Sequence, residues 1–196
     1  MIKAVIFDLG AVVVDFTNHD YYVQLAKKTG LKLGTVEKAF DGVELDLMEK
    51  GRMRLGTFEK KMAEKLNLKG IELGWYDFFV ENAKINFDVQ ELVGMLHKDY
   101  ITAFISNVDK SRYIHTRKMI NLDFFDYKFA SCYIGSRKPG RKIYDFAIKR
   151  MGIKYENAVF IDELQENVDG AEKLGIKGIR FENRRKLDKE LYKLGL

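Results

Sequence analysis

The chain contains a single cysteine, Cys132, among its 196 residues. One cysteine excludes an internal disulfide and a zinc cluster built from several thiolates, and it fits a reducing compartment. Long hydrophobic runs are also missing: the run from Ala11 to Val14 lies between Asp8 and Asp15, far short of the roughly 20 residues that cross a membrane. The apolar start of the chain is too short for a signal peptide. We therefore expect a soluble, cytoplasmic protein with no membrane partner.

Charge of one sign is not in large excess either. The 34 Lys and Arg residues face 29 Asp and Glu residues, and the net charge of +5 is spread along the chain. The basic tail, Arg184 to Lys189, is interrupted by Asp188, and apolar residues recur around it at helical spacing, at Leu187, Leu191 and Leu194. This pattern is typical of a helix that docks on a core and exposes a charged face, so we expect no nucleic-acid partner.

Hydrophobic residues make up 46 % of the chain, enough for a well-covered core. Several short apolar runs lack alternation, which is typical of strands buried on both faces of a parallel sheet. These runs are Ala4–Phe7, Ile101–Ile105, Ala158–Ile161, Gly178–Phe181 and, more weakly, Phe129–Ser131. Helical patterns separate them, at Val89–His97, Ser111–Met119, Arg141–Met151, Gln165–Leu174 and Arg184–Leu194. The alternation predicts an α/β fold with a doubly wound parallel sheet.

One stretch breaks this alternation. Between Asn18 and Asn86 nearly every segment has a helical pattern, and glycines punctuate the segments. A helical block of this length after the first strand predicts a lid over one edge of the sheet. We expect residues 16–86 to form this helical cap domain, and residues 1–15 and 87–196 to form the core domain.

Polar side chains follow the predicted strands at the places where the strands end. In an open parallel sheet, ligands bind outside the carboxyl ends of the strands, so these side chains should meet at one edge. Lys138 is a further candidate, because it directly precedes the only proline and lies in a rigid turn before a helix. The strand-end candidates are Asp8, Ser106, Asn107, Asp162 and Glu163.

Each of these residue types suits the transfer of a phosphoryl group beside a divalent cation. The carboxylate of Asp8 can attack phosphorus, and Asp162 supplies a second carboxylate for Mg²⁺, which prefers oxygen ligands. Lys138 would neutralise charge on the phosphoryl group, while Ser106 and Asn107 offer a hydroxyl and an amide to its oxygens. Each residue also has a structural interpretation: Asp8 as a turn residue, Ser106 or Asn107 as a helix cap, and Lys138 as a surface charge.

Four motifs in this order resemble those of the haloacid dehalogenase-like (HAD) hydrolase superfamily, in its capped subfamily I. They are Ile6–Val13, Phe104–Asn107, Ser136–Pro139 and Val159–Glu163. The resemblance covers nearly the whole chain, and four ordered motifs are far more specific than one. It implies a Rossmann-like core with a helical cap inserted after the first strand, in agreement with the helical pattern.

The resemblance also implies roles for the strand-end residues. Asp8 would be the nucleophile, and an Mg²⁺ cofactor would lie among Asp8, Asp162 and the backbone carbonyl of Gly10, with Glu163 in the outer shell. The implied catalytic set is Asp8, Ser106, Lys138 and Asp162. The residues implied to bind substrate and its phosphoryl oxygens are Gly10, Ser106, Asn107 and Lys138.

One position departs from the pattern of most phosphatases in this superfamily. They carry an aspartate two residues after the nucleophile as general acid and base, whereas this chain has Gly10. The chain is most similar to a subgroup with the same Asp-Leu-Gly form, which includes bacterial sugar-phosphate phosphatases and relatives of the epoxide-hydrolase N-terminal domain. Asp15, His19 and Asp20, near the entry to the cap, are candidates to replace the missing proton donor.

We therefore expect an Mg²⁺-dependent phosphatase that hydrolyses a small phosphorylated metabolite, such as a sugar phosphate, through an aspartyl-phosphate intermediate. Two alternatives stay open: a 2-haloacid dehalogenase, which needs no metal, and a non-catalytic module that binds a phosphorylated ligand. The sequence fits a monomer or a homodimer. Some cap aromatics either contact the substrate or form the cap core, namely Tyr21, Tyr22, Phe40, Trp75 and Tyr76.

Overall fold

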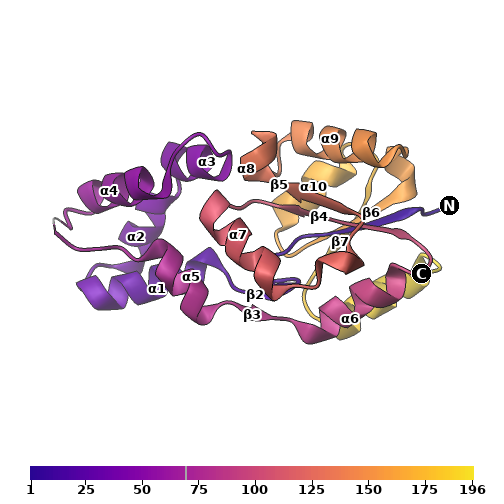
Figure 1. The fold of residues 1–196 in the computed structure, drawn as a ribbon, viewed down its shortest axis with the longest axis horizontal. Coiled ribbons are helices and arrows are strands. Elements are labelled where there is room, and N and C mark those ends of the chain that lie inside the picture. The colour runs from indigo at the N-terminus through magenta and orange to yellow at the C-terminus, as the bar shows by residue number, and fades with distance from the viewer. Residues whose placement is uncertain (69) are drawn as a thin grey trace.

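The computed structural model describes residues 1–68 and 70–196. Its centre is a five-stranded sheet in which all neighbouring strands are parallel (Figure 1). From one edge to the other, the strands are β5 (Tyr127–Ala130), β4 (Ile101–Ser106), β1 (Ala4–Phe7), β6 (Ala158–Asp162) and β7 (Lys177–Arg180). Phe7 in β1 is level with Phe104 in β4 and Ile161 in β6. The residues that follow these three central strands are therefore brought together at one edge of the sheet.

Helices cover both faces of the sheet. They are α6 (Phe87–Leu96), α7 (Lys110–Met119), α9 (Arg141–Met151), α10 (Gln165–Glu172) and α11 (Arg184–Lys193), and a short α8 (Ser131–Ile134) follows β5. Ala4 and Ile6 share a core cluster with residues of α9 and α10, while Val5 and Phe7 share one with residues of α6, α7 and α11. Burial on both faces explains why these strands contain so few polar residues. The predicted doubly wound α/β fold is confirmed.

Five helices between β1 and α6 form a separate layer beyond one end of the sheet, on the left in Figure 1. We call them the five-helix insert: α1 (Asn18–Thr29), α2 (Leu33–Phe40), α3 (Val43–Glu49), α4 (Leu55–Lys65) and α5 (Trp75–Asn82). Its centre is a cluster of aromatic rings whose neighbouring centroids lie 4.8 to 5.7 Å apart, formed by Tyr21, Phe40, Phe58 and Trp75. These four side chains are buried, and they belong to the same hydrophobic cluster as Phe7 of β1.

Two short strands connect the insert to the rest of the chain. The chain enters through β2 (Val14–Asp15) and leaves through β3 (Lys84–Ile85), and these strands pair antiparallel. Val14 lies opposite Ile85, and Asp15 lies opposite Lys84. The entry and exit of the insert are therefore adjacent.

Side-chain caps fix the helix starts nearest to the sheet edge. Thr17 and Asp20 form a reciprocal capping box at the start of α1. The Asp109 carboxylate accepts hydrogen bonds from the backbone N–H groups of Ser111 and Arg112 and so caps the start of α7. Within the described residues, no helix combines the length and the apolar composition needed to cross a membrane.

Candidate active site

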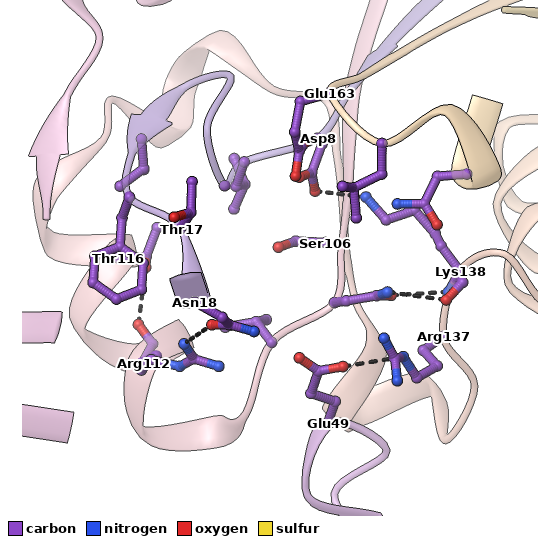
Figure 2. Close-up of a pocket in the computed structure, with 18 of the residues that line it drawn as sticks. Asp8, Thr17, Asn18, Glu49, Ser106, Arg112, Thr116, Arg137, Lys138 and Glu163 are labelled. Atoms are coloured by element: carbon purple, nitrogen blue, oxygen red, sulfur yellow. Dashed lines mark hydrogen bonds and ion pairs between the residues drawn. The ribbon is translucent and has the colours of Figure 1, made fainter. Parts of the chain in front are cut away.

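The predicted strand-end residues meet at the carboxyl edge of the sheet, facing the five-helix insert. Asp8 follows β1, Ser106 ends β4, and Lys138 comes from the loop before α9; all three line a cavity of about 500 Å³. Asp162, at the end of β6, is fully buried against Lys138. Figure 2 shows Asp8 at one end of this cavity and Glu49 of the insert at the other, with Ser106 between them.

Lys138 links the two strand-end aspartates. Its Nζ atom lies 2.6 Å from Asp8 Oδ1 and 2.6 Å from Asp162 Oδ2, and its side chain is 1 % exposed. Burial alone would lower the pKa of Lys138, but the two carboxylates outweigh burial and raise it. The ammonium group is therefore a permanent positive charge beside the Asp8 carboxylate.

Two asparagines hold this arrangement in place. Asn107 donates from Nδ2 to the Lys138 carbonyl at 3.0 Å and accepts from the Lys138 N–H at 2.8 Å. Asn167 Nδ2 donates to both oxygens of Asp162, at 2.9 and 3.1 Å, and the Leu164 N–H donates to Asp162 Oδ1 at 2.9 Å. The Asn107 amide thus positions Lys138. Asn167 lies four residues after the fourth motif, and its contact with Asp162 was not predicted.

Three carboxyl groups converge on the same point. Ligand oxygens of Asp8, Asp162 and Glu163 all lie within 4.8 Å of one another. Burial, partly offset by Lys138, raises the pKa of Asp8 to about 6. Burial, together with the charges of Asp8 and Asp162, raises the pKa of Glu163 to about 9. Glu163 Oε2 is buried and has no hydrogen-bond partner among the described residues.

This donor set fits a hard divalent cation. The oxygens are carboxylate oxygens, one of them has no partner, and the carboxyl groups have more negative charge than Lys138 alone can balance. Mg²⁺ prefers oxygen ligands and keeps several waters, so two or three protein carboxylates suffice. Gly10, the other implied ligand, lines the cavity next to Asp8.

The wall of the cavity opposite Asp8 contains side chains that the sequence analysis did not select. Glu49, the last residue of α3, lies 3.0 Å from the Arg137 guanidinium. Arg112 donates from Nη1 to Asn18 at 2.8 Å and lines the same space. These residues come together only when the insert packs on the core, so their positions in the sequence carry no local signal.

The predicted replacements for the missing proton donor have different surroundings. His19 lines the cavity and lies 3.0 Å from Glu37. Asp15 is exposed in β2, and Asp20 belongs to the capping box of α1. Neither aspartate lines the cavity.

The aromatic lining of the cavity also differs from the set considered in the sequence. Phe16 and Phe79 line the cavity, with ring centroids 4.8 Å apart. None of the cap aromatics named from the sequence does so; those fully buried form the insert core, and Tyr76 packs edge-on against His115. The core interpretation is therefore correct for Tyr21, Phe40 and Trp75.

A parallel sheet with an acidic, oxygen-rich site at its carboxyl edge defines an α/β protein that binds a ligand where its strands end. The chain matches the family model of haloacid dehalogenase-like hydrolases over residues 2–175. It therefore belongs to the haloacid dehalogenase-like hydrolase family, and the predicted family is confirmed.

Three relatives are similar over nearly the whole chain. The D-ribitol-5-phosphate phosphatase of Bacteroides thetaiotaomicron is 25 % identical over 197 residues, covering 93 % of each chain. A solved HAD-like family hydrolase of Porphyromonas gingivalis has a TM-score of 0.79 and 24 % identity, covering 99 % of this chain and 98 % of that chain. A HAD family enzyme of B. thetaiotaomicron, solved with magnesium and inorganic phosphate, has a TM-score of 0.77 and 21 % identity, covering 95 % and 99 %. The two structures show that the fold is shared.

Proposed function

We propose that this protein is an Mg²⁺-dependent phosphatase that hydrolyses a small phosphorylated metabolite through an aspartyl-phosphate on Asp8. The observation that carries the proposal is the buried set of Asp8, Lys138 and Asp162, with Glu163 beside it, at one end of the cavity. The phosphatase name of one relative and the magnesium and phosphate in the structure of another support it.

Asp8, Lys138 and Ser106 would have distinct roles in hydrolysis of the phosphate ester. An Asp8 carboxylate oxygen attacks phosphorus, the bond between phosphorus and the alcohol oxygen breaks, and the alkoxide leaves and takes a proton from solvent. Water then attacks the phosphorus of the aspartyl-phosphate, releasing phosphate and restoring Asp8. Lys138 keeps Asp8 ionised and stabilises the charge on the phosphoryl oxygens, to which Ser106 donates a hydrogen bond.

Asp8 and Asp162 would bind the metal directly, with the Gly10 carbonyl as a third ligand and Glu163 completing the site. When bound, Mg²⁺ would withdraw charge from the phosphoryl oxygens and so allow the carboxylate and the phosphate to approach each other. Asn167 keeps Asp162 in position, and Asn107 does the same for Lys138. Asn107 would thus act on the substrate through Lys138.

The five-helix insert would act as the cap. We propose that residues 16–86 form this cap, which limits access of water and selects the substrate, and that residues 1–15 and 87–196 form the catalytic core.

The acidic cluster argues against a dehalogenase, because attack on carbon needs no metal site. The lone cysteine favours a cytoplasmic location.

The decisive experiment is to compare phosphate release from phenyl phosphate by the wild type and by Asp8→Asn, with Mg²⁺ present. We expect no turnover by the variant and no turnover by the wild type with EDTA, while circular dichroism shows an unchanged fold. Normal turnover by Asp8→Asn would refute the nucleophile assignment. Chloride release from 2-chloropropionate without metal would instead favour the dehalogenase.

A further inference from the structure

Glu49 is held at the far end of the cavity by the core of the protein. Its backbone carbonyl accepts a hydrogen bond of 2.6 Å from the Ser131 hydroxyl, which is itself fully buried. Two residues later, Gly51 packs so closely that a Cβ atom there would lie 2.2 Å from the Cys132 carbonyl oxygen. The carboxyl end of α3 therefore rests directly on α8, and this contact fixes the direction of the Glu49 side chain.

The Glu49 carboxylate retains hydrogen-bonding capacity. The residue is 2 % exposed and lines the cavity, and its Oε2 atom lies 3.0 Å from Arg137 Nε. The angles of this contact do not make a hydrogen bond, so both atoms are buried without a hydrogen-bond partner among the described residues. Figure 2 shows the Glu49 carboxylate pointing into the cavity on the side of Ser106. A buried carboxylate in this state is stabilised by any donor that a ligand supplies.

The surrounding charges restrict what that donor can be. Arg137 already balances the charge of Glu49, and a second guanidinium, that of Arg112, lines the same cavity. A cationic ligand would be repelled by both arginines, whereas a neutral hydroxyl can donate to the carboxylate at no cost in charge. The apolar wall formed by Phe16 and Phe79 offers a surface for carbon atoms.

We propose that Glu49 is a specificity-determining residue that accepts hydrogen bonds from hydroxyl groups of the substrate, and that the substrate class is therefore the polyol and sugar phosphates. This inference rests on the proposed phosphatase activity. With the phosphoryl group at Asp8, the hydroxyl groups extend along the cavity to Glu49, and the carbon chain lies against the phenylalanines. Burial raises the pKa of Glu49, and Arg137 acts by lowering it, which favours the ionised form.

The test compares the wild type with Glu49→Ala and Glu49→Gln on three substrates in Mg²⁺: a pentitol 5-phosphate, phenyl phosphate and phosphoethanolamine. The readout is the ratio of kcat/KM for the pentitol phosphate to kcat/KM for phenyl phosphate. We expect Glu49→Ala to lower this ratio roughly 10- to 100-fold, the range for a hydrogen bond to a charged group, mainly through KM. Glu49→Gln keeps one acceptor oxygen and should give an intermediate ratio.

Lys50→Ala is the matched control. It removes the side chain next to Glu49, which pairs with Asp46 and does not line the cavity, so the ratio of the two kcat/KM values should stay unchanged. If the Glu49 variants also leave the ratio unchanged, Glu49 only holds the insert in place and the inference is wrong. Preferential hydrolysis of phosphoethanolamine also overturns it, as does turnover of phenyl phosphate without turnover of the pentitol 5-phosphate. If the wild type hydrolyses none of these esters, the proposed function itself fails.

Discussion

Lys138 is the residue on which the electrostatics of the site depend. Replacing it by alanine leaves the carboxylates of Asp8 and Asp162 buried together without a cation, which raises the pKa of Asp8 and weakens it as a nucleophile. We expect Lys138→Ala to lower kcat by at least roughly 10²-fold, the scale for the loss of one electrostatic stabiliser. Steady-state kinetics of phosphate release would measure this.

The control for that change is Lys149→Ala, which removes an exposed lysine from the last turn of α9. It should leave kcat unchanged. A mild effect of Lys138→Ala, similar to that of the control, would show that Lys138 has only a structural role.

Gly10 leaves room for the acid that most related phosphatases carry. A Cβ atom there would meet the Phe16 carbonyl at 3.6 Å and Asp8 Oδ2 at 3.7 Å, which are ordinary contacts. Gly10→Asp should therefore fold and supply a proton to the leaving group. We expect kcat for the pentitol phosphate to rise by about 10²-fold, at the lower end of general acid catalysis.

The gain should be much smaller for phenyl phosphate, because phenolate leaves more readily without a proton. Gly10→Asn, which has nearly the same shape but no proton to give, is the control. An equal change in kcat for both substrates, or the same gain with asparagine, would contradict general acid catalysis at position 10.

The raised pKa values of Asp8 and Glu163 make metal binding depend on pH. Between about pH 6 and about pH 9, Asp8 is ionised while Glu163 still holds a proton that a cation must displace. The Mg²⁺ affinity should thus increase by up to about tenfold per pH unit in this window and level off above it. Below about pH 6, Asp8 also takes up a proton and the slope becomes steeper.

Isothermal titration calorimetry in buffers of different ionisation enthalpy would count the released protons. In Glu163→Gln, the release between about pH 6 and about pH 9 should disappear. If that variant released as many protons as the wild type, the proton would have to come from another group.

For single residues, the sequence predicted the side chains that meet at the sheet edge, but it did not predict those that line the opposite wall of the cavity. The convergence of Asp8, Ser106 and Asp162 follows from the strand order alone, because each side chain ends a buried run. Glu49 and Arg137 could not be found this way. Their contact joins residues far apart in the sequence, and it exists only after the insert has packed on the core.

Among the helices, α7 connects the sheet edge to the insert. Asp109 caps it and also accepts from Arg112 Nε at 2.6 Å, with both side chains 4 % exposed. Arg112 in turn lies 4.4 Å from the Trp75 ring and donates to Asn18. One capping residue therefore also orients a guanidinium that holds two helices of the insert.

Asp109→Ala removes both the cap and the partner of a buried charge. We expect the free energy of unfolding to fall by about 3–5 kcal/mol, the usual cost of leaving a buried charge without its partner. Thr17→Ala removes the more exposed cap of α1 and should cost only about 1 kcal/mol. Urea unfolding of both variants would measure the difference, and equal losses would show that the ion pair contributes little.

Helices and strands were predictable to different degrees. The helical block expected between Asn18 and Asn86 contains the observed helices α1 to α5. The strands β2 and β3 were missed, because two residues are too short to show any periodicity. They are nevertheless the elements that place the insert over the site.

For the molecule as a whole, the doubly wound α/β fold and the family were predictable, and both are confirmed. Three of the four motifs contain a buried strand followed by a polar site residue, so they indicate which segments form the central strands and where these strands end. The packing of the insert on the core depends on α3 meeting α8 and on Arg112 meeting Trp75, contacts that no local pattern encodes. For that reason the cap aromatics could not be assigned to core or substrate in advance.

The adjacent pairing of β2 and β3 has a consequence for the evolution of such proteins. Asp15 and Lys84 are directly opposed, so a two-residue Asn-Gly hairpin could join them and replace everything between. The sheet contacts of β1, β4 and β6 would not be interrupted by that deletion. During evolution, a single recombination event could therefore replace the five-helix insert by another insert. Such a replacement would change the range of substrates and leave the residues at the sheet edge unchanged.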